Sequence, residues 1–362
     1  MEKEKPLISA SGHPGQLQGV RSKFLTPWIW VGGGLIIMAV LSAAIGPVAI
    51  PPNVIFKILL SRLPFVTIEV DWPSTFNTIL YQIRLPHTAL IALTGMALGA
   101  SGAAYQGLFR NPLADPYIIG VASGAGLAAV LTMSIQWPST TLGLITIPAA
   151  AFTGALITVG IVYLFARVGR TTPITTLILA GVAVSTFTSA LTSLIMLLST
   201  DELYRAIAWL MGGSALGGWP PVLAALPYLF VGLAVLIFLG RPLNVLQFGD
   251  EQALQLGLNV ERYKLVIVAA SSLVAATAVS FSGIIGFIGL VVPHLVRLLW
   301  GPDYRRLIPL ATIVGGIVLL ASDIVARTIL APRELPVGIV TAVIGAPFFL
   351  WLLRRAKQVR FW

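Results

Sequence analysis

The 362 residues of the chain are 57% hydrophobic and only 10% charged, and none of them is cysteine. A soluble domain carries roughly 25% charged residues, so this composition excludes an ordinary water-soluble fold and predicts a protein of the lipid bilayer. The net charge of +10 does not indicate a nucleic-acid partner, because the basic residues lie in short clusters between apolar runs.

Ten apolar stretches are long enough to cross a bilayer, which takes about 17–25 helical residues each. We therefore expect an all-α polytopic membrane protein with a transmembrane domain over residues 28–353. The polar residues 1–27 are expected to form a cytoplasmic N-terminal tail, since no small-residue cleavage pattern follows the first apolar run, and residues 354–362 a basic cytoplasmic C-terminal tail. The expected spans lie near residues 28–46, 88–109, 117–135, 142–166, 174–199, 220–239, 264–281, 283–300, 307–331 and 336–353.

The basic residues are distributed unevenly over the segments between these spans. If both termini lie in the cytoplasm, the inside segments hold 16 of the 23 basic residues. Cytoplasmic loops are enriched in Lys and Arg, so this orientation fits ten spans better than nine or eleven, and it predicts a multi-pass protein of the bacterial inner membrane. The inside residues are Lys3, Lys5, Arg21, Lys23, Arg110, Arg167, Arg170, Arg241, Arg262, Lys264, Arg305, Arg306, Arg354, Arg355, Lys357 and Arg360.

Glycines recur at short intervals in two of the spans. Gly95 and Gly99 lead into Gly102, and a second run has Gly at every third position over residues 283–289. Small residues let membrane helices approach closely, so both runs predict tight helix packing. The second run also shortens the seventh and eighth spans, which leaves a broken-helix substrate route as an alternative.

Motifs for catalysis are missing from the chain. It has no Gly-x-x-x-x-Gly-Lys-Ser/Thr phosphate loop, so ATP hydrolysis in the usual way is not expected of it. His13, His87 and His294 have no carboxylate or second ligand at a metal-binding spacing. We therefore expect a non-enzymatic protein with no catalytic residues, no metal site and no cofactor.

Asp323 and Arg327 lie within the ninth span, where an ionisable group costs about 2.5–3.5 kcal/mol at mid-bilayer. Their i,i+4 spacing favours an ion pair near the outer end of the span. The functional alternative frees Arg327 to face a partner outside the cell.

Residues 246–264, between the sixth and seventh spans, are too polar to cross the membrane. Gly249, followed by two acidic residues, indicates a helix start, and Gly257 supplies a stop. Two short helices at the membrane surface that expose Leu254 and Leu256 would form a docking site for a cytoplasmic protein. An ordinary amphipathic surface loop is the alternative.

Several longer motifs resemble the permease family of type II ATP-binding-cassette importers for iron–siderophore complexes, haem and cobalamin. The resemblance extends from about Pro27 to the C-terminus and leaves only the N-terminal tail outside. The segments that carry it are residues 83–86 (IRLP), 106–116 (QGLFRNPLADP), 286–294 (GFIGLVVPH), 321–327 (ASDIVAR) and 334–338 (ELPVG).

The resemblance implies ten helices per subunit and two subunits around a central path, with a second copy of this chain as the expected partner. It also implies that residues 246–264 are the coupling-helix pair that docks into a cytoplasmic ATPase subunit, which would supply the missing phosphate loop. The residues expected at this contact are Gly249, Asp250, Glu251, Ala253, Leu254, Leu256 and Gly257.

On the outer face, the resemblance implies arginines that pair with glutamates of a periplasmic binding protein. Arg84 and Arg327 match two of these positions. The position three after Arg84, often arginine in the family, is His87 here, which would make that docking charge sensitive to pH. Arg333 is a nearby substitute.

The inner gate in the family lies where the fourth and fifth spans meet. That place is occupied here by residues 172–176, with Ile174, Thr175 and Thr176 as the expected gate residues. The alternative for these residues is helix capping by Thr172 or Thr175.

The expected function is ATP-driven import of a metal chelate, an iron–siderophore complex or haem, handed over by a periplasmic binding protein. Cobalamin is the alternative cargo. A secondary transporter coupled to protons or sodium is the alternative of another class, but it would need more intramembrane acids than Asp323 alone. The expected partners are the ATPase subunits, the binding protein, a second permease copy and the lipid bilayer.

Overall fold

The computed structural model describes residues 14–46, 48, 50–62, 69–135, 141–198, 203–213 and 217–356. Within these ranges every regular element is helical, apart from an isolated bridge between Val168 and Thr171. The elements are α1 (Pro14–Ala44), α2 (Pro52–Leu60), α3 (Ser74–Thr78), the π-helix η1 (Ile79–Arg84), α4 (Leu85–Leu108), α5 (Val121–Met133), α6 (Thr141–Ala166), α7 (Ile174–Leu198), α8 (Leu203–Leu210), α9 (Pro220–Phe238), α10 (Gly240–Leu246), α11 (Asp250–Gln255), α12 (Val260–Ser282), α13 (Ile288–Trp300), α14 (Tyr304–Thr328) and α15 (Val337–Ala356).

The described residues contain seven helical segments long and apolar enough to cross a membrane, and α5, α13 and α15 are shorter apolar helices. Together they account for the ten expected spans. The second of the seven segments runs without interruption from Ser74 to Leu108, through α3, η1 and α4. It therefore begins well before the expected start at residue 88.

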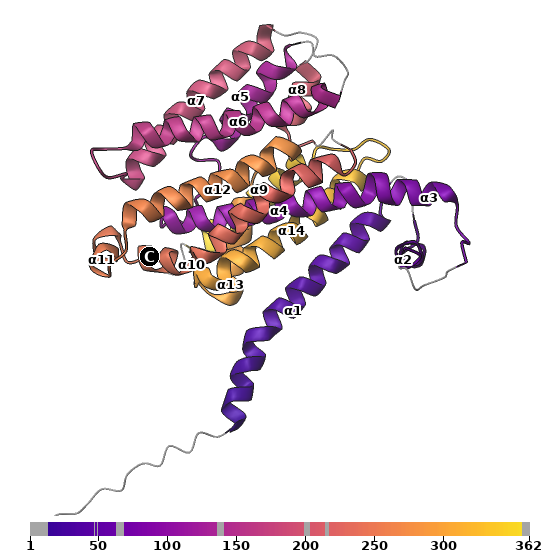
Figure 1. Ribbon diagram of the computed structural model, residues 1–362, viewed down its shortest axis with the longest axis horizontal. Helices are drawn as coiled ribbons and strands as arrows, with labels where there is room; N and C mark the ends of the chain where they lie inside the picture. The colour runs from indigo at the N-terminus through magenta and orange to yellow at the C-terminus, as the bar shows by residue number, and fades with distance from the viewer. Residues whose placement is uncertain are drawn as a thin grey trace, which may run out of the picture.

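Figure 1 shows the helices arranged in two parts, with α5, α6 and α7 forming a layer beside the rest of the bundle. α12 packs against both α4 and α6 and so joins the two parts. α4 is the central helix. In the segment Ser74–Leu108, which contains it, 78% of the most apolar 18-residue stretch is buried, against only 17% of the corresponding stretch in α7. α10 and α11 lie at one end of the bundle, and α2, α3 and α8 lie at the other (Figure 1).

Glycine makes the contact between α4 and α14 possible. A Cβ atom at Gly95 would overlap the carbonyl of Gly315, and one at Gly99 would overlap the carbonyl of Ala311. Gly102 meets Gly289 of α13 in the same way. The predicted close packing is confirmed for the first glycine run and for Gly283 and Gly289 of the second, because an added Cβ atom at each would overlap a neighbouring segment. Gly286, in contrast, has nothing within 4 Å of such a Cβ atom.

The chain breaks its helices within the membrane at two places. α5 and α13 have 13 residues each, so each spans about 20 Å of a hydrocarbon core roughly 30 Å thick. The non-helical residues before them therefore enter the membrane, where backbone polar groups need partners inside the protein. The Tyr117 hydroxyl donates to the carbonyl of Ile285 at 2.9 Å and ties the two breaks together. The helix of the eighth span accordingly starts at Ile288, whereas the span was predicted to be helical from residue 283.

Candidate functional site

The short helix α11 begins and ends as the sequence predicts. Gly249 precedes it with φ +106°, and Gly257 follows it with φ +83°, both in conformations that favour glycine. Ala253 is fully buried, whereas the side chains of Leu254 and Leu256 are 59% and 67% exposed. Phe248, which the sequence reasoning missed, is 68% exposed beside them. These three side chains form an apolar surface at the end of the bundle.

The prediction of two short helices within residues 246–264 is wrong. The segment contains α11 alone, because Asn259 caps α12 by accepting a hydrogen bond from the Arg262 amide at 3.2 Å. Residues 260–264 are therefore the first turn of the long helix α12. The other short helix, α10, precedes the segment.

α11 is fastened to its surroundings through charged side chains. The Lys264 ammonium group lies 2.6 Å from the Asp250 carboxylate and donates to the Thr172 carbonyl at 3.1 Å. Arg110, at the end of α4, reaches the other Asp250 oxygen at 3.5 Å. Just before α11, Gln247 donates to the Gly107 carbonyl at 2.8 Å. The helix thus connects α4, α12 and the loop between α6 and α7.

α10 is tied to the start of α14. The Asn244 amide donates to the Asp303 carboxylate at 2.6 Å, and the Asn244 oxygen accepts from the Tyr304 amide at 2.9 Å. Burial raises the pKa of Asp303, but the hydrogen bonds from Asn244 and from the Arg305 amide, with the charges of Arg305 and Arg306, outweigh it and hold this pKa below its usual range. The Asp303 carboxylate therefore stays ionised at neutral pH.

At the opposite end, two of the predicted docking arginines are buried. Arg84 is 6% exposed and Arg327 is 8% exposed. Arg84 donates to the Ala43 and Ala44 carbonyls at 2.8 Å each and also bonds the Val48 carbonyl. Arg84 therefore binds the C-terminal end of α1.

Arg327 joins three helices. Its Nε donates to the Asp323 carboxylate at 2.9 Å, which confirms the predicted ion pair. Its Nη1 donates to the Ile45 carbonyl at 3.0 Å, and its Nη2 to the Ser42 hydroxyl at 3.0 Å. His87 lies 3.0 Å from the second Asp323 oxygen. The guanidinium is thus committed to α1 and to its own helix in this structure.

Arg333 differs from the other predicted docking residues because it is exposed. It lies in the turn between α14 and α15, on the same end of the bundle as Arg327. Of the four predicted docking residues, it presents its charge to solvent, and His87 is only partly accessible.

The predicted gate residues lie at the start of α7. Thr175 is exposed, and Ile174 and Thr176 are partly buried. The Thr176 hydroxyl donates to the Ala166 carbonyl at 2.9 Å and to the Pro173 carbonyl at 2.8 Å, and so closes the turn between α6 and α7. This turn is closed by Thr176, whereas Thr172 and Thr175 were the residues proposed as caps.

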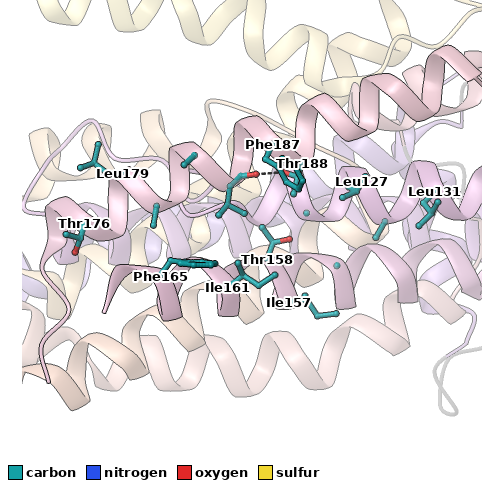
Figure 2. Close-up of a pocket in the computed structure, with 16 residues that line it drawn as sticks. Leu127, Leu131, Ile157, Thr158, Ile161, Phe165, Thr176, Leu179, Phe187 and Thr188 are labelled. Carbon is teal, nitrogen blue, oxygen red and sulfur yellow. Dashed lines mark hydrogen bonds between the residues drawn. The ribbon is translucent and has the colours of Figure 1, made fainter. Parts of the chain in front are cut away.

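A groove of about 910 Å³ runs between α5, α6 and α7, and Thr176 lies at one of its ends. Figure 2 shows Phe165, Ile161 and Ile157 along α6, facing Leu127 and Leu131 of α5 across the groove. The lining is almost wholly apolar. The predicted gate thus opens onto a smooth hydrophobic wall that offers few hydrogen-bond partners.

Within the described ranges, no group of three or more His, Cys, Asp or Glu side chains could hold a metal ion. His13 lies outside these ranges. Ten apolar helices among the described residues, an apolar surface at one end of the bundle and an apolar groove between α5, α6 and α7 are the features of a membrane permease.

Comparison with known proteins gives this class a family. The model of the FecCD transport family matches residues 34–355, and the chain belongs to this family. An uncharacterised ABC transporter permease, YvrB of Bacillus subtilis, is 41% identical over 325 residues, which cover 90% of this chain and 92% of that protein. The cobalamin import system permease BtuC of Halobacterium salinarum is 44% identical and covers 88% of each chain.

A solved structure has the same fold. It is an inward-facing conformation of an ABC transporter assigned to the metal-chelate type, with a TM-score of 0.77 and 32% sequence identity. The match covers 90% of this chain and 98% of that one. The chain is therefore a multi-span permease of the ABC transporter class, as the sequence motifs predict.

Proposed function

We propose that this permease forms the translocation path of an ATP-driven importer and that α11 receives the force for transport from a separate ATPase subunit. The observation that carries the proposal is the exposed apolar side chains of Leu254 on α11 and of Phe248 and Leu256 on either side of it, at a helix fixed to three other elements. An apolar patch rimmed by charged residues is typical of a protein–protein contact. A helix that is held by several contacts can transmit a movement of its partner subunit to the rest of the bundle.

The proposed cargo is a metal chelate, an iron–siderophore complex or haem. The structural relative of the metal-chelate type supports this class. Cobalamin is the second candidate, because one relative of similar identity is named as a cobalamin permease. The apolar groove fits either cargo, since a path must bind a large molecule weakly enough to release it.

A second copy of the chain is the proposed partner within the membrane. α7 is the least covered of the long helices, with only 17% of its apolar window buried. Its exposed face carries hydroxyl groups from Thr186, Ser189 and Ser193. Small Ser and Thr residues are typical of contacts between membrane helices, so this face suits packing against a second subunit.

The ion-coupled alternative is less well supported by the same residues. It depended on Asp323, and the two Asp323 oxygens are engaged by Arg327 and His87. A carboxylate that is paired with a cation on its own helix has a structural role and is not available to bind a transported ion.

The test of this proposal starts from the contact itself. Leu254→Asp combined with Leu256→Asp is expected to abolish co-purification of the ATPase subunit, because two charges would have to be desolvated at the interface. Val70→Asp, an exposed apolar position at the opposite end, is the matched control and is expected to retain the subunit. Co-purification that survives the double change would overturn the assignment of α11.

Transport is measured in proteoliposomes that contain the permease and its ATPase. Uptake of a ferric siderophore, haemin or cobalamin from the binding protein is expected to require ATP. Uptake driven by a proton or sodium gradient without nucleotide would contradict the proposal. Competition among the three cargoes identifies the substrate.

A further inference from the structure

One buried cation joins α11 to the base of the predicted gate. The Lys264 residue is only 4% exposed, yet its ammonium group has three polar partners. These are the Asp250 carboxylate on α11 at 2.6 Å, the Glu261 carboxylate at 3.1 Å and the Thr172 carbonyl at 3.1 Å. Every N–H donor of the ammonium group can therefore be used within the protein.

Glu261 reinforces the same connection. Its second carboxylate oxygen accepts a hydrogen bond from the Thr172 amide at 2.9 Å. Both backbone polar groups of Thr172 are thus held by side chains from the first turn of α12. Thr172 itself is 3% exposed, so water competes little for these bonds.

The loop that holds Thr172 leads directly into α7. Ile174, two residues later, is the first residue of α7. The Thr176 hydroxyl binds carbonyls on both sides of the turn, which makes residues 166–176 a closed unit. A continuous chain of contacts therefore runs from Asp250, the first residue of α11, through Lys264 and Thr172 to the start of α7.

The second ion pair of Asp250 is less suited to this task. Arg110 and Asp250 are separated by 3.5 Å, and both side chains are more than a third exposed. Exposed pairs are screened by solvent and contribute little. Lys264 is the buried member of the cluster, with 5% of its side chain exposed, and so holds its partners more firmly.

We propose that Lys264 is a positioning residue that couples movement of α11 to the α6–α7 loop and to the start of α7. The proposal rests on the proposed function of α11 as the contact for the ATPase. In this proposal, Lys264, Asp250 and Glu261 together connect α11 to Thr172, in the loop before α7.

The first test measures the connection in the permease alone. The chain has no cysteine, so spin labels can be placed at Gln255→Cys and Arg170→Cys, two exposed positions at either end of the connection. The distance distribution between the labels is expected to be narrow. Lys264→Met is expected to broaden it, whereas Arg262→Met, which removes an exposed cation from the same turn, leaves it unchanged.

A milder variant separates coupling from loss of structure. Asp250→Asn removes both ion pairs of Asp250, the buried one to Lys264 and the exposed one to Arg110, but leaves Lys264 bound to Glu261 and Thr172. Asp250→Asn is expected to broaden the distance distribution with little change in thermal stability. Lys264→Arg, which keeps the positive charge at this position, is expected to leave the distribution narrow. An unchanged distribution in both Lys264→Met and Asp250→Asn would overturn the proposal.

The second test uses the complete complex with its ATPase subunit. Lys264→Met is expected to lower uptake per ATP hydrolysed by about tenfold, within the range usual for coupling between two sites. The ATPase subunit should still co-purify and hydrolyse ATP. Equal loss of uptake and hydrolysis would refute the coupling role, whereas failure of the unmodified permease to bind an ATPase would refute only the proposed function.

Discussion

Arg84 and Arg327 donate to the last carbonyl groups of α1, although they come from η1 and α14. The final carbonyls of a helix have no partner within it, and they form the negative end of the helix dipole. Gly46 leaves room for this contact, because a Cβ atom there would lie 2.8 Å from the Arg84 guanidinium. At the scale of single residues, these arginines complete α1.

Replacing one of these arginines tests that role. Arg327→Met is expected to lower the stability of the folded protein by about 3–5 kcal/mol, because it leaves the buried Asp323 carboxylate without its cation. The double variant Asp323→Asn, Arg327→Met is expected to recover part of the loss. The melting temperature of the purified protein in detergent measures both effects.

Arg333→Met is the matched control, since Arg333 is exposed and its removal should leave the melting temperature unchanged. Arg333→Glu should weaken docking of the binding protein without loss of stability. A stable Arg327→Met variant with weakened docking would instead favour the role first predicted for Arg327.

The residue-scale predictions succeeded where the partner is close in sequence. The Asp323–Arg327 pair follows from i,i+4 spacing, because such residues share a helix face. The bond from Arg327 to Ile45 crosses 282 positions, and no local pattern indicates it. The same limit explains why the link from Lys264 to Thr172 was missed.

α4 and α14 pack so closely that there is no room for one added methyl group between them. Gly99→Ala adds a Cβ atom where the Ala311 carbonyl lies, so we expect stability to fall by about 1–3 kcal/mol or more, as in other overpacked cores. Gly33→Ala in α1 is the matched control, because no atom lies within 4 Å of the added Cβ. Alanine favours a helix over glycine by about 1 kcal/mol.

Thermal unfolding in detergent, monitored by circular dichroism, compares the two variants. The control should melt at the same temperature as the unmodified protein or higher. If both variants melted alike, the close approach of α4 and α14 would not contribute to stability.

At the scale of elements, the hydropathy of the sequence was enough to predict how many spans there are, but it did not predict where the helices begin and end. Ten apolar runs gave ten helices, because a bilayer demands continuous hydrogen-bonded helix from each run. The break before α13 was foreseen only as an alternative, from the glycines at residues 283–289. The break before α5 was missed because the apolar residues 117–120 were counted as part of the third span, whereas α5 begins at Val121. α2 and α8 were missed because short helices outside the spans have no length signal, and α3 was missed because it extends the second span ahead of its predicted start.

The whole molecule has two different ends, and labelling can assign each to a side of the membrane. In a chain without cysteine, Leu256→Cys in intact cells is expected to resist a membrane-impermeant maleimide, because the excess of basic residues places this end in the cytoplasm. Arg333→Cys should react once the outer membrane is made permeable. The reverse pattern of labelling would invert the proposed orientation.

The contact between α1 and Arg327 has a consequence for the order of synthesis. α1 leaves the ribosome before α14, since Arg327 follows Ile45 by 282 residues, which takes roughly 15–60 s at ordinary rates of translation. Through that interval the end of the first helix has only water and, later, Arg84 to bind its carbonyls. The C-terminal end of α1 is therefore expected to take its final position only after the ninth span has been made, and a chain truncated before α14 is expected to leave that helix loosely held.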